Sequence, residues 1–213
     1  MLDHNGYNSL QTVAEADKTF TDRQQWFQKL APLLGRTEFR EKYNLCLVHR
    51  HFILQPDERM VATGLVTQPE IFPASDSTRR DIIPSSWTAA GAPFEWKRVE
   101  ALEEIVAPPP AELIREFLGI VGEGSVLGLS LAPEPLPDGQ IWSEHVDRDL
   151  RQHIVEIKPL EALSGDSTSN TSWKVKISSD GGQEEPSFIF SVQCTCPKKD
   201  SDGTHGEHHP TSD

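Results

Sequence analysis

The stretch LVHRHFILQPDERM, residues 47–60, decides how we interpret this sequence. It places His49 and His51 two residues apart in an apolar run, and a Pro56-Asp57 pair follows. The run 45–54 has the length and composition of a β-strand, and a Pro-Asp pair favours a turn. We therefore predict a β-hairpin in which residues 59–66 return as the second strand.

Side chains alternate across a strand, so His49 and His51 would share one face and Arg50 would lie on the other. In the expected register, Ala62 and Gly64 stand opposite the histidines and leave space above them. Two interpretations remain open. The histidines are acid/base groups or metal ligands of a functional site, or they are neutral, hydrogen-bonded residues of a half-buried sheet.

A functional histidine pair needs support from other parts of the chain. Residues 140–146 and 151–157 read as two further strands of a hairpin, which would bring their titratable groups near the first one. The residues that we expect to support the pair, as catalytic groups or as further metal ligands, are Arg50, Glu58, Glu144, His145 and His153. The alternative for the later strands is a solvated sheet face with cross-strand ion pairs.

The C-terminal residues 194–213 contain the densest set of soft metal ligands in the chain. They have no hydrophobic pattern, so we predict a disordered tail. Thiolates together with imidazoles suit zinc or copper, which are the cofactors we consider, although the spacing is not that of a zinc finger. The candidate metal ligands of the tail are Cys194, Cys196, His205 and His208. The alternative is a tail whose ligands are incidental.

Residues 67–98 contain several prolines and little periodicity, so we predict a long ordered loop. Trp87 and Trp96 lie in this segment. If they form the wall of an enclosed pocket around the histidines, an enzyme is favoured, and if they form an open apolar patch, a protein that binds a partner is favoured. The alternative is that they pack the loop onto the sheet.

The order of the expected elements predicts the fold class. Apolar residues at helical spacing follow Asp22 and again follow the prolines 108–110, and several more strands come after the second helix. We predict an α+β fold with a mostly antiparallel sheet, N-terminal helices and one inserted helix. Residues 1–19 would form a loose leader, and residues 20–193 would form a single domain.

The composition excludes several classes of function. The net charge is −13 and the basic residues are scattered, which argues against binding to nucleic acid or to an anionic membrane. The three cysteines do not form a disulfide framework, and we find no signal peptide or apolar span of 18 residues. We therefore expect a cytoplasmic protein. The common nucleotide-binding and hydrolase motifs are absent from the sequence.

The segment LCLVHRHFILQPDERMVATGLVTQPE, followed by PSSW, FEW and a Cys/His-bearing C-terminus, resembles a group of proteins from filamentous fungi. The resemblance implies a source and no activity, and it slightly favours small-molecule chemistry. Two hypotheses follow. The protein is a small-molecule enzyme that uses His49 and His51 as acid/base groups or metal ligands, or it is a non-catalytic binding protein with a metal-binding tail. The sequence does not determine the oligomeric state.

Overall fold

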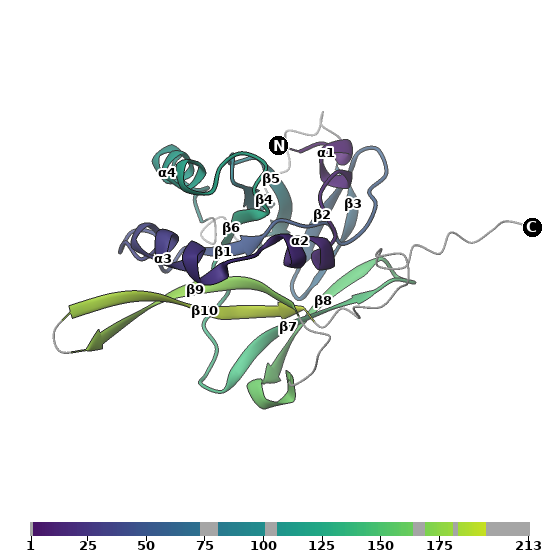
Figure 1. Ribbon diagram of the computed structural model, residues 1–213. Coiled ribbons are helices and arrows are strands. Elements are labelled where there is room, and N and C mark those ends of the chain that lie inside the picture. Colours follow the sequence, from purple (N-terminus) through teal and green to yellow (C-terminus); the bar gives the residue numbers. More distant parts are fainter. Residues whose placement is uncertain (1, 73–80, 101–105, 164–168, 181–182, 195–213) are drawn as a thin grey trace, which may run out of the picture.

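The computed structural model describes residues 2–72, 81–100, 106–163, 169–180 and 183–194. Within them, strands close into a barrel in the order β1-β6-β4-β5-β2-β3-β8-β7-β10-β9 (Figure 1). The β2–β5 and β7–β10 pairs are parallel and the other neighbours are antiparallel. The strands are β1 (Tyr43–Leu47), β2 (Glu58–Thr63), β3 (Val66–Ile71), β4 (Ile82–Thr88), β5 (Pro93–Arg98), β6 (Leu127–Leu131), β7 (Gln140–Asp147), β8 (Gln152–Pro159), β9 (Ser169–Asp180) and β10 (Gln183–Cys194).

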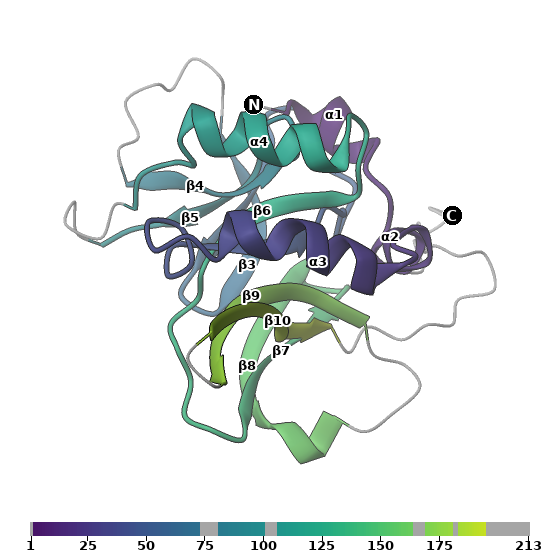
Figure 2. The ribbon, with the colours of Figure 1, turned by 60° about the vertical axis from the view of Figure 1, so that its left-hand side comes forward.

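The helices accompany the barrel on its outside. They are α1 (His4–Asn8), α2 (Val13–Thr19), α3 (Arg23–Leu34), α4 (Ala111–Val121) and the short 3-10 helix η2 (Leu160–Leu163). Figure 2 shows α3 and α4 lying across the strands β6 and β9. Arg36, just after α3, donates hydrogen bonds of 3.0 and 2.6 Å to the Glu116 carboxylate of α4, which ties the two helices together.

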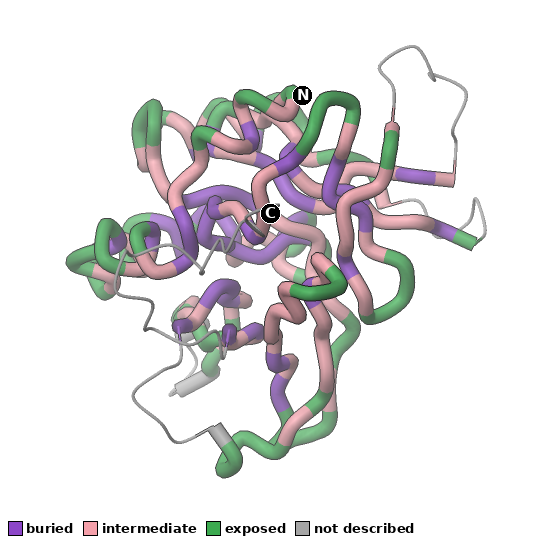
Figure 3. The backbone as a smooth tube through the Cα atoms, turned by 90° about the vertical axis from the view of Figure 1, so that its right-hand side faces the viewer, coloured by how far each residue is buried: buried purple, intermediate pink, exposed green. Residues whose placement is uncertain are grey.

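The largest hydrophobic core lies between these helices and the outer face of the barrel wall. Its buried members include Leu30, Leu33 and Leu34 of α3, Leu113 and Phe117 of α4, and Leu45, Leu127 and Leu129 of the strands. Burying one such side chain contributes about 1.5–3 kcal/mol. Figure 3 shows the buried stretches gathered in the middle of the molecule. Because the outer face supplies this core, polar side chains can occupy part of the barrel interior.

Several local predictions are confirmed. The amphipathic segments form α3 and α4, and α3 continues through Pro32 to Leu34. The hairpin of β7 and β8 forms through residues 148–151, and β9 and β10 are among the strands expected after the second helix.

The predicted fold class is wrong. The chain does not form a mostly antiparallel α+β sheet with two edges, because β9 returns to pair with β1 and closes the ten strands into a mixed barrel. Strand positions follow from local composition, whereas closure depends on pairings between residues far apart in sequence.

The predicted hairpin of residues 45–54 with 59–66 is also wrong. β1 ends at Leu47 and pairs with β6 and β9, while β2 pairs with β3 and β5. The backbone N–H groups that would pair with a second hairpin strand are hydrogen-bonded to the N-terminal segment instead. The N–H groups of Arg50, His51 and Leu54 donate to the Gln11 carbonyl, the Tyr7 hydroxyl and the Asn8 side chain at 2.9, 3.0 and 2.8 Å.

The structure differs from the sequence prediction in two further segments. Residues 1–19, expected to be a loose leader, contain α1 and α2, and a capping box of Thr12 and Glu15 begins α2. Residues 67–98, expected to be a loop, contain most of β3 and all of β4 and β5. Pro84 and Pro93 obscured these strands, since Pro84 adjoins a register irregularity and Pro93 begins β5, where a missing N–H is tolerated.

Candidate functional site

A cavity of about 320 Å³ lies inside the barrel. Three imidazoles and two carboxylates share its wall, and we call it the His–Glu cavity. Gly64 and the half-exposed Leu65 also line it, so it reaches the surface at the turn between β2 and β3. The defining residues are His49, His51, Glu95, Glu144 and His153.

His51 lies at the centre of the imidazole cluster. Its ring stacks on His153 with 4.0 Å between centroids, and it meets His49 edge to face at 4.7 Å. Its Nε2 lies 3.2 Å from Oε1 of Glu95, whose other oxygen accepts a hydrogen bond of 3.1 Å from Ser86. Burial favours the neutral form of Glu95, but the contact with His51 outweighs burial, so the pKa of Glu95 is lowered.

His153 and Glu144 form a second buried pair. Nε2 of His153 lies 3.6 Å from Oε2 of Glu144, and the two side chains are 6% and 15% exposed. Thr171 donates a hydrogen bond of 3.0 Å to the same Glu144 oxygen. Burial opposes both charges, but their mutual attraction outweighs it. The pKa of His153 is therefore raised, and the pKa of Glu144 is lowered to about 2.

His49 differs from His153 in its electrostatic environment. Its Nδ1 lies 2.9 Å from the Leu47 carbonyl oxygen, so Nδ1 carries the proton and Nε2 presents a lone pair. That Nε2 atom is buried and has no hydrogen-bond partner within the described part of the chain. Burial, and then the neighbouring His51, lower the pKa of His49 to about 4. His49 is therefore a neutral acceptor at pH 7.

The N-terminal helices cover the cluster on one side. The buried Tyr7 hydroxyl accepts the backbone N–H of His51 at 3.0 Å. Arg50 points away from the histidines, as expected from alternation, and its guanidinium donates to the carbonyl oxygens of Asn8 and Leu10. Arg50 therefore fastens the N-terminal segment and does not line the His–Glu cavity.

The structure places the other predicted supporting residues apart from the histidines. Glu58 forms a salt bridge with Arg151 at 2.9 Å and accepts the Gln55 N–H at 2.7 Å, which closes the turn at Pro56. His145 lies 41% exposed and 3.3 Å from Glu156. Ala62 and Gly64 do line the cavity with the histidines, but barrel closure brings them there instead of the predicted hairpin.

The two predicted pocket tryptophans do not line the His–Glu cavity. Trp87 is buried and meets Tyr43 edge to face, while Trp96 is buried against Val61 and Ile82. Neither forms an open patch. Trp142 of β7 lines the cavity instead, and it shares its face of the strand with Glu144, as the alternation predicted.

The predicted metal ligands fall into two groups. His49 and His51 meet edge to face, with 4.7 Å between their ring centroids. Among the residues that the structure describes, no group of three or more His, Cys, Asp or Glu side chains has an arrangement that would hold a metal ion. The prediction for Cys194 is wrong, because Cys194 is buried at the end of β10 and is disulfide-bonded, so it offers no thiolate to a metal ion. The tail ligands Cys196, His205 and His208 lie outside the described residues.

Sequence reasoning missed Glu95. The segment FEWKR alternates aromatic and charged residues, which is the pattern of a strand with one apolar and one polar face. That alternation indicated a strand with Glu95 on its polar face, but the neighbouring prolines led us to predict a loop. It also missed that Cys46 lines the same cavity as His49. Burial raises the pKa of the Cys46 thiol, so this side chain is protonated and is no nucleophile.

Comparison with known proteins gave no further guide: no protein family, curated protein or solved structure matches this chain. In the part of the chain that the structure describes, no helix is long and apolar enough to cross a membrane. The function therefore has to be inferred from the chemistry of the His–Glu cavity.

Proposed function

We propose that this protein is an acid–base enzyme that moves a proton on a small organic molecule held in the His–Glu cavity. One observation carries the proposal: the cavity contains His49, whose buried Nε2 has no hydrogen-bond partner among the described residues, together with the His153–Glu144 pair at 3.6 Å. The pKa of His49 is lowered to about 4 and that of His153 is raised. Two titratable groups whose surroundings push their pKa values apart can act as base and acid at the same pH. The volume of about 320 Å³ is at the small end of small-molecule sites.

In the proposed reaction, Nε2 of His49 takes a proton from the substrate carbon next to a carbonyl group. The His153–Glu144 pair donates a proton to the carbonyl oxygen, which gives the enol. For a hydroxyketone, protonated His49 then gives its proton to the former carbonyl carbon, and the neighbouring hydroxyl of the enediol returns a proton to the His153–Glu144 pair. This step yields the isomer and restores both groups to their starting protonation. His51 lies between the two groups and is held by Glu95 at 3.2 Å.

The surroundings of His49 restrict the substrate. A base with a pKa near 4 is weak, so the proton that it removes must be acidic, as in a hydroxyketone or a 1,3-dicarbonyl compound. The two carboxylates in the wall disfavour a substrate that arrives as an anion. We therefore propose an uncharged carbonyl compound as the substrate.

The test measures solvent deuterium entering a panel of small hydroxyketones and 1,3-dicarbonyl compounds in D₂O, followed by proton NMR. Wild-type protein should accelerate exchange for part of the panel, and His49→Gln should reduce the rate at least about 100-fold. His145→Gln is the matched control, because His145 is a half-exposed histidine outside the cavity. No exchange above the buffer rate, or equal rates in His49→Gln, would reject the proposal.

A ligand carrier is the second candidate. The observation that favours it is the same weakly basic Nε2 of His49, since a weak base with a buried lone pair is also a suitable hydrogen-bond acceptor. Saturable binding of panel compounds that His49→Gln weakens, without deuterium exchange, would favour this function.

We also propose that the protein works in the cytoplasm, an expectation from composition alone. Fractionation of cells that express the tagged chain would test it.

A further inference from the structure

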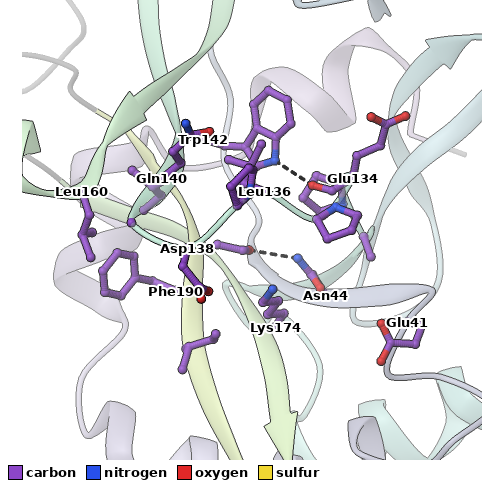
Figure 4. Close-up of a pocket in the computed structure, with 18 of the residues that line it drawn as sticks. Glu41, Asn44, Glu134, Leu136, Asp138, Gln140, Trp142, Leu160, Lys174 and Phe190 are labelled. Carbon is purple, nitrogen blue, oxygen red and sulfur yellow. Dashed lines mark hydrogen bonds between the residues drawn. The ribbon is translucent and has the colours of Figure 1, made fainter.

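A second cavity of about 380 Å³ adjoins the His–Glu cavity (Figure 4). One side of its wall is a proline-rich segment, residues 132–139, which we call the strap. Parts of β7 and β10 form other sides. Ala132, Pro133 and Trp142 line both cavities, so a single layer of side chains separates the two.

The lining of the second cavity is mixed: large apolar side chains lie together with charged groups such as Asp138 and Lys174. Figure 4 shows Leu136, Leu160 and Phe190 around the same hollow as Trp142. Leu160, Ile189 and Phe190 are 46%, 37% and 39% exposed, although their side chains are large and apolar. Water against such a concave apolar surface is unfavourable, so an apolar occupant would recover hydrophobic free energy.

A chain of buried hydrogen bonds connects the walls of the two cavities. Asn44 is 1% exposed, and its Nδ2 donates to Oγ of Ser191 at 2.9 Å and of Ser172 at 3.3 Å. Ser191 lines the second cavity and Ser172 lines the His–Glu cavity. Asn44 Oδ1 has no partner among the described residues, which leaves a buried acceptor for a ligand donor in the wall of the second cavity.

Trp142 forms the partition between the cavities. Its Nε1–H donates to the Glu134 carbonyl oxygen of the strap at 3.1 Å. The three prolines of the strap have no backbone N–H, so the strap cannot pair continuously as a strand with its neighbours. The contact with Trp142 is thus one of the few hydrogen bonds that can hold the strap in place.

We propose that the two cavities form one ligand site for an elongated amphiphilic molecule. Its polar, reacting head occupies the His–Glu cavity, and its apolar arm passes Trp142 into the second cavity beside Phe190. The position of the head rests on the proposed function. The position of the arm rests on the shared walls and on the uncovered apolar side chains.

The test uses straight-chain 1-alkanols from butanol to octanol, whose hydroxyl can donate to Nε2 of His49. Dissociation constants are measured by NMR titration of the wild-type protein and its variants. We expect affinity to rise about fourfold with each added methylene that enters the second cavity. Phe190→Ser should flatten this rise and leave butanol binding unchanged. Ile157→Ser is the matched control, because Ile157 is 47% exposed and lines neither cavity.

Two kinds of failure are distinguishable. An affinity that does not rise with chain length, or that rises equally in Phe190→Ser, overturns the two-cavity site and leaves the proposed function standing. A rise with chain length that His49→Gln does not affect supports the apolar arm but overturns the placement of the head, and with it the proposed role of His49.

Discussion

Replacing Glu144 by Gln tests how much the buried ion pair between Glu144 and His153 stabilises the folded protein. In the folded protein the pKa of Glu144 is about 2, against an ordinary value of 4.5. Each pKa unit corresponds to about 1.4 kcal/mol, so ionised Glu144 contributes about 3 kcal/mol of stability. The two side chains are only 6% and 15% exposed, so solvent screens little of this contribution.

The sign of the pH dependence follows from the two shifts. The lowered pKa of Glu144 gives stability that is present above pH 4.5 and is lost as the pH falls towards 2. The raised pKa of His153 also stabilises the folded protein. This contribution is complete below the ordinary histidine pKa of 6.5 and is lost as the pH rises through the pKa that His153 has in the folded protein. Near pH 6 the Glu144→Gln variant should therefore be less stable than wild type by about 3 kcal/mol, and the difference should shrink in acid.

The assay is urea denaturation followed by tryptophan fluorescence at pH 6, 4 and 3. Glu156→Gln is the matched control, since Glu156 also pairs with a histidine between β7 and β8, but both side chains are 41% exposed. Its denaturation midpoint should change little because water screens that pair. Two results would refute the reasoning. One is that Glu144→Gln and Glu156→Gln are equally stable at pH 6, and the other is that the loss of unfolding free energy in Glu144→Gln, relative to wild type, is as large at pH 3 as at pH 6.

Three further predictions concern other parts of the molecule. The free energy of unfolding of the wild type should fall by up to about 3 kcal/mol as the pH is lowered from 6.5 to 4. The reason is that His49 binds a proton in this range in the unfolded chain but not in the folded protein, where its pKa is about 4. Melting curves of His49→Gln at the same pH values should lack this loss. Gly128→Ala should lower the free energy of unfolding by about 3 kcal/mol in urea denaturation, since its Cβ would clash with the Trp87 carbonyl oxygen. Gly119→Ala, whose Cβ meets nothing within 4 Å, should instead raise it by about 0.5–1 kcal/mol. Arg50→Gln should speed hydrogen exchange in α1 and α2 at least about tenfold, because it removes the guanidinium contacts to Asn8 and Leu10.

Features that depend on neighbours in sequence could be predicted. The apolar spacing that forms α3 and α4, and the strand patterns of β7 to β10, are local periodicities that survive in any tertiary context compatible with them. Alternation also predicted that His49 and His51 point away from Arg50, and that Trp142 and Glu144 share a face. The capping box of Thr12 and Glu15 was a readable local signal for α2 that the sequence analysis did not use.

The composition of the candidate site depended on the tertiary structure. His49 and His51 were predicted as a pair, but Glu95, Glu144 and His153 reach them only because β5, β7 and β8 close around one interior. The hairpin prediction failed for the same kind of reason, since the N-terminal segment competes for the backbone groups of residues 50–54.

The sequence by itself therefore determined the residue types at the centre of the site and the side of the chain to which they point. Only the tertiary structure decided their protonation and their partners. Burial and the nearest opposite charge set a pKa, and both come from residues that lie far away along the chain. His49 and His153 are the same residue type, yet burial lowers the pKa of the first, whereas Glu144 raises the pKa of the second.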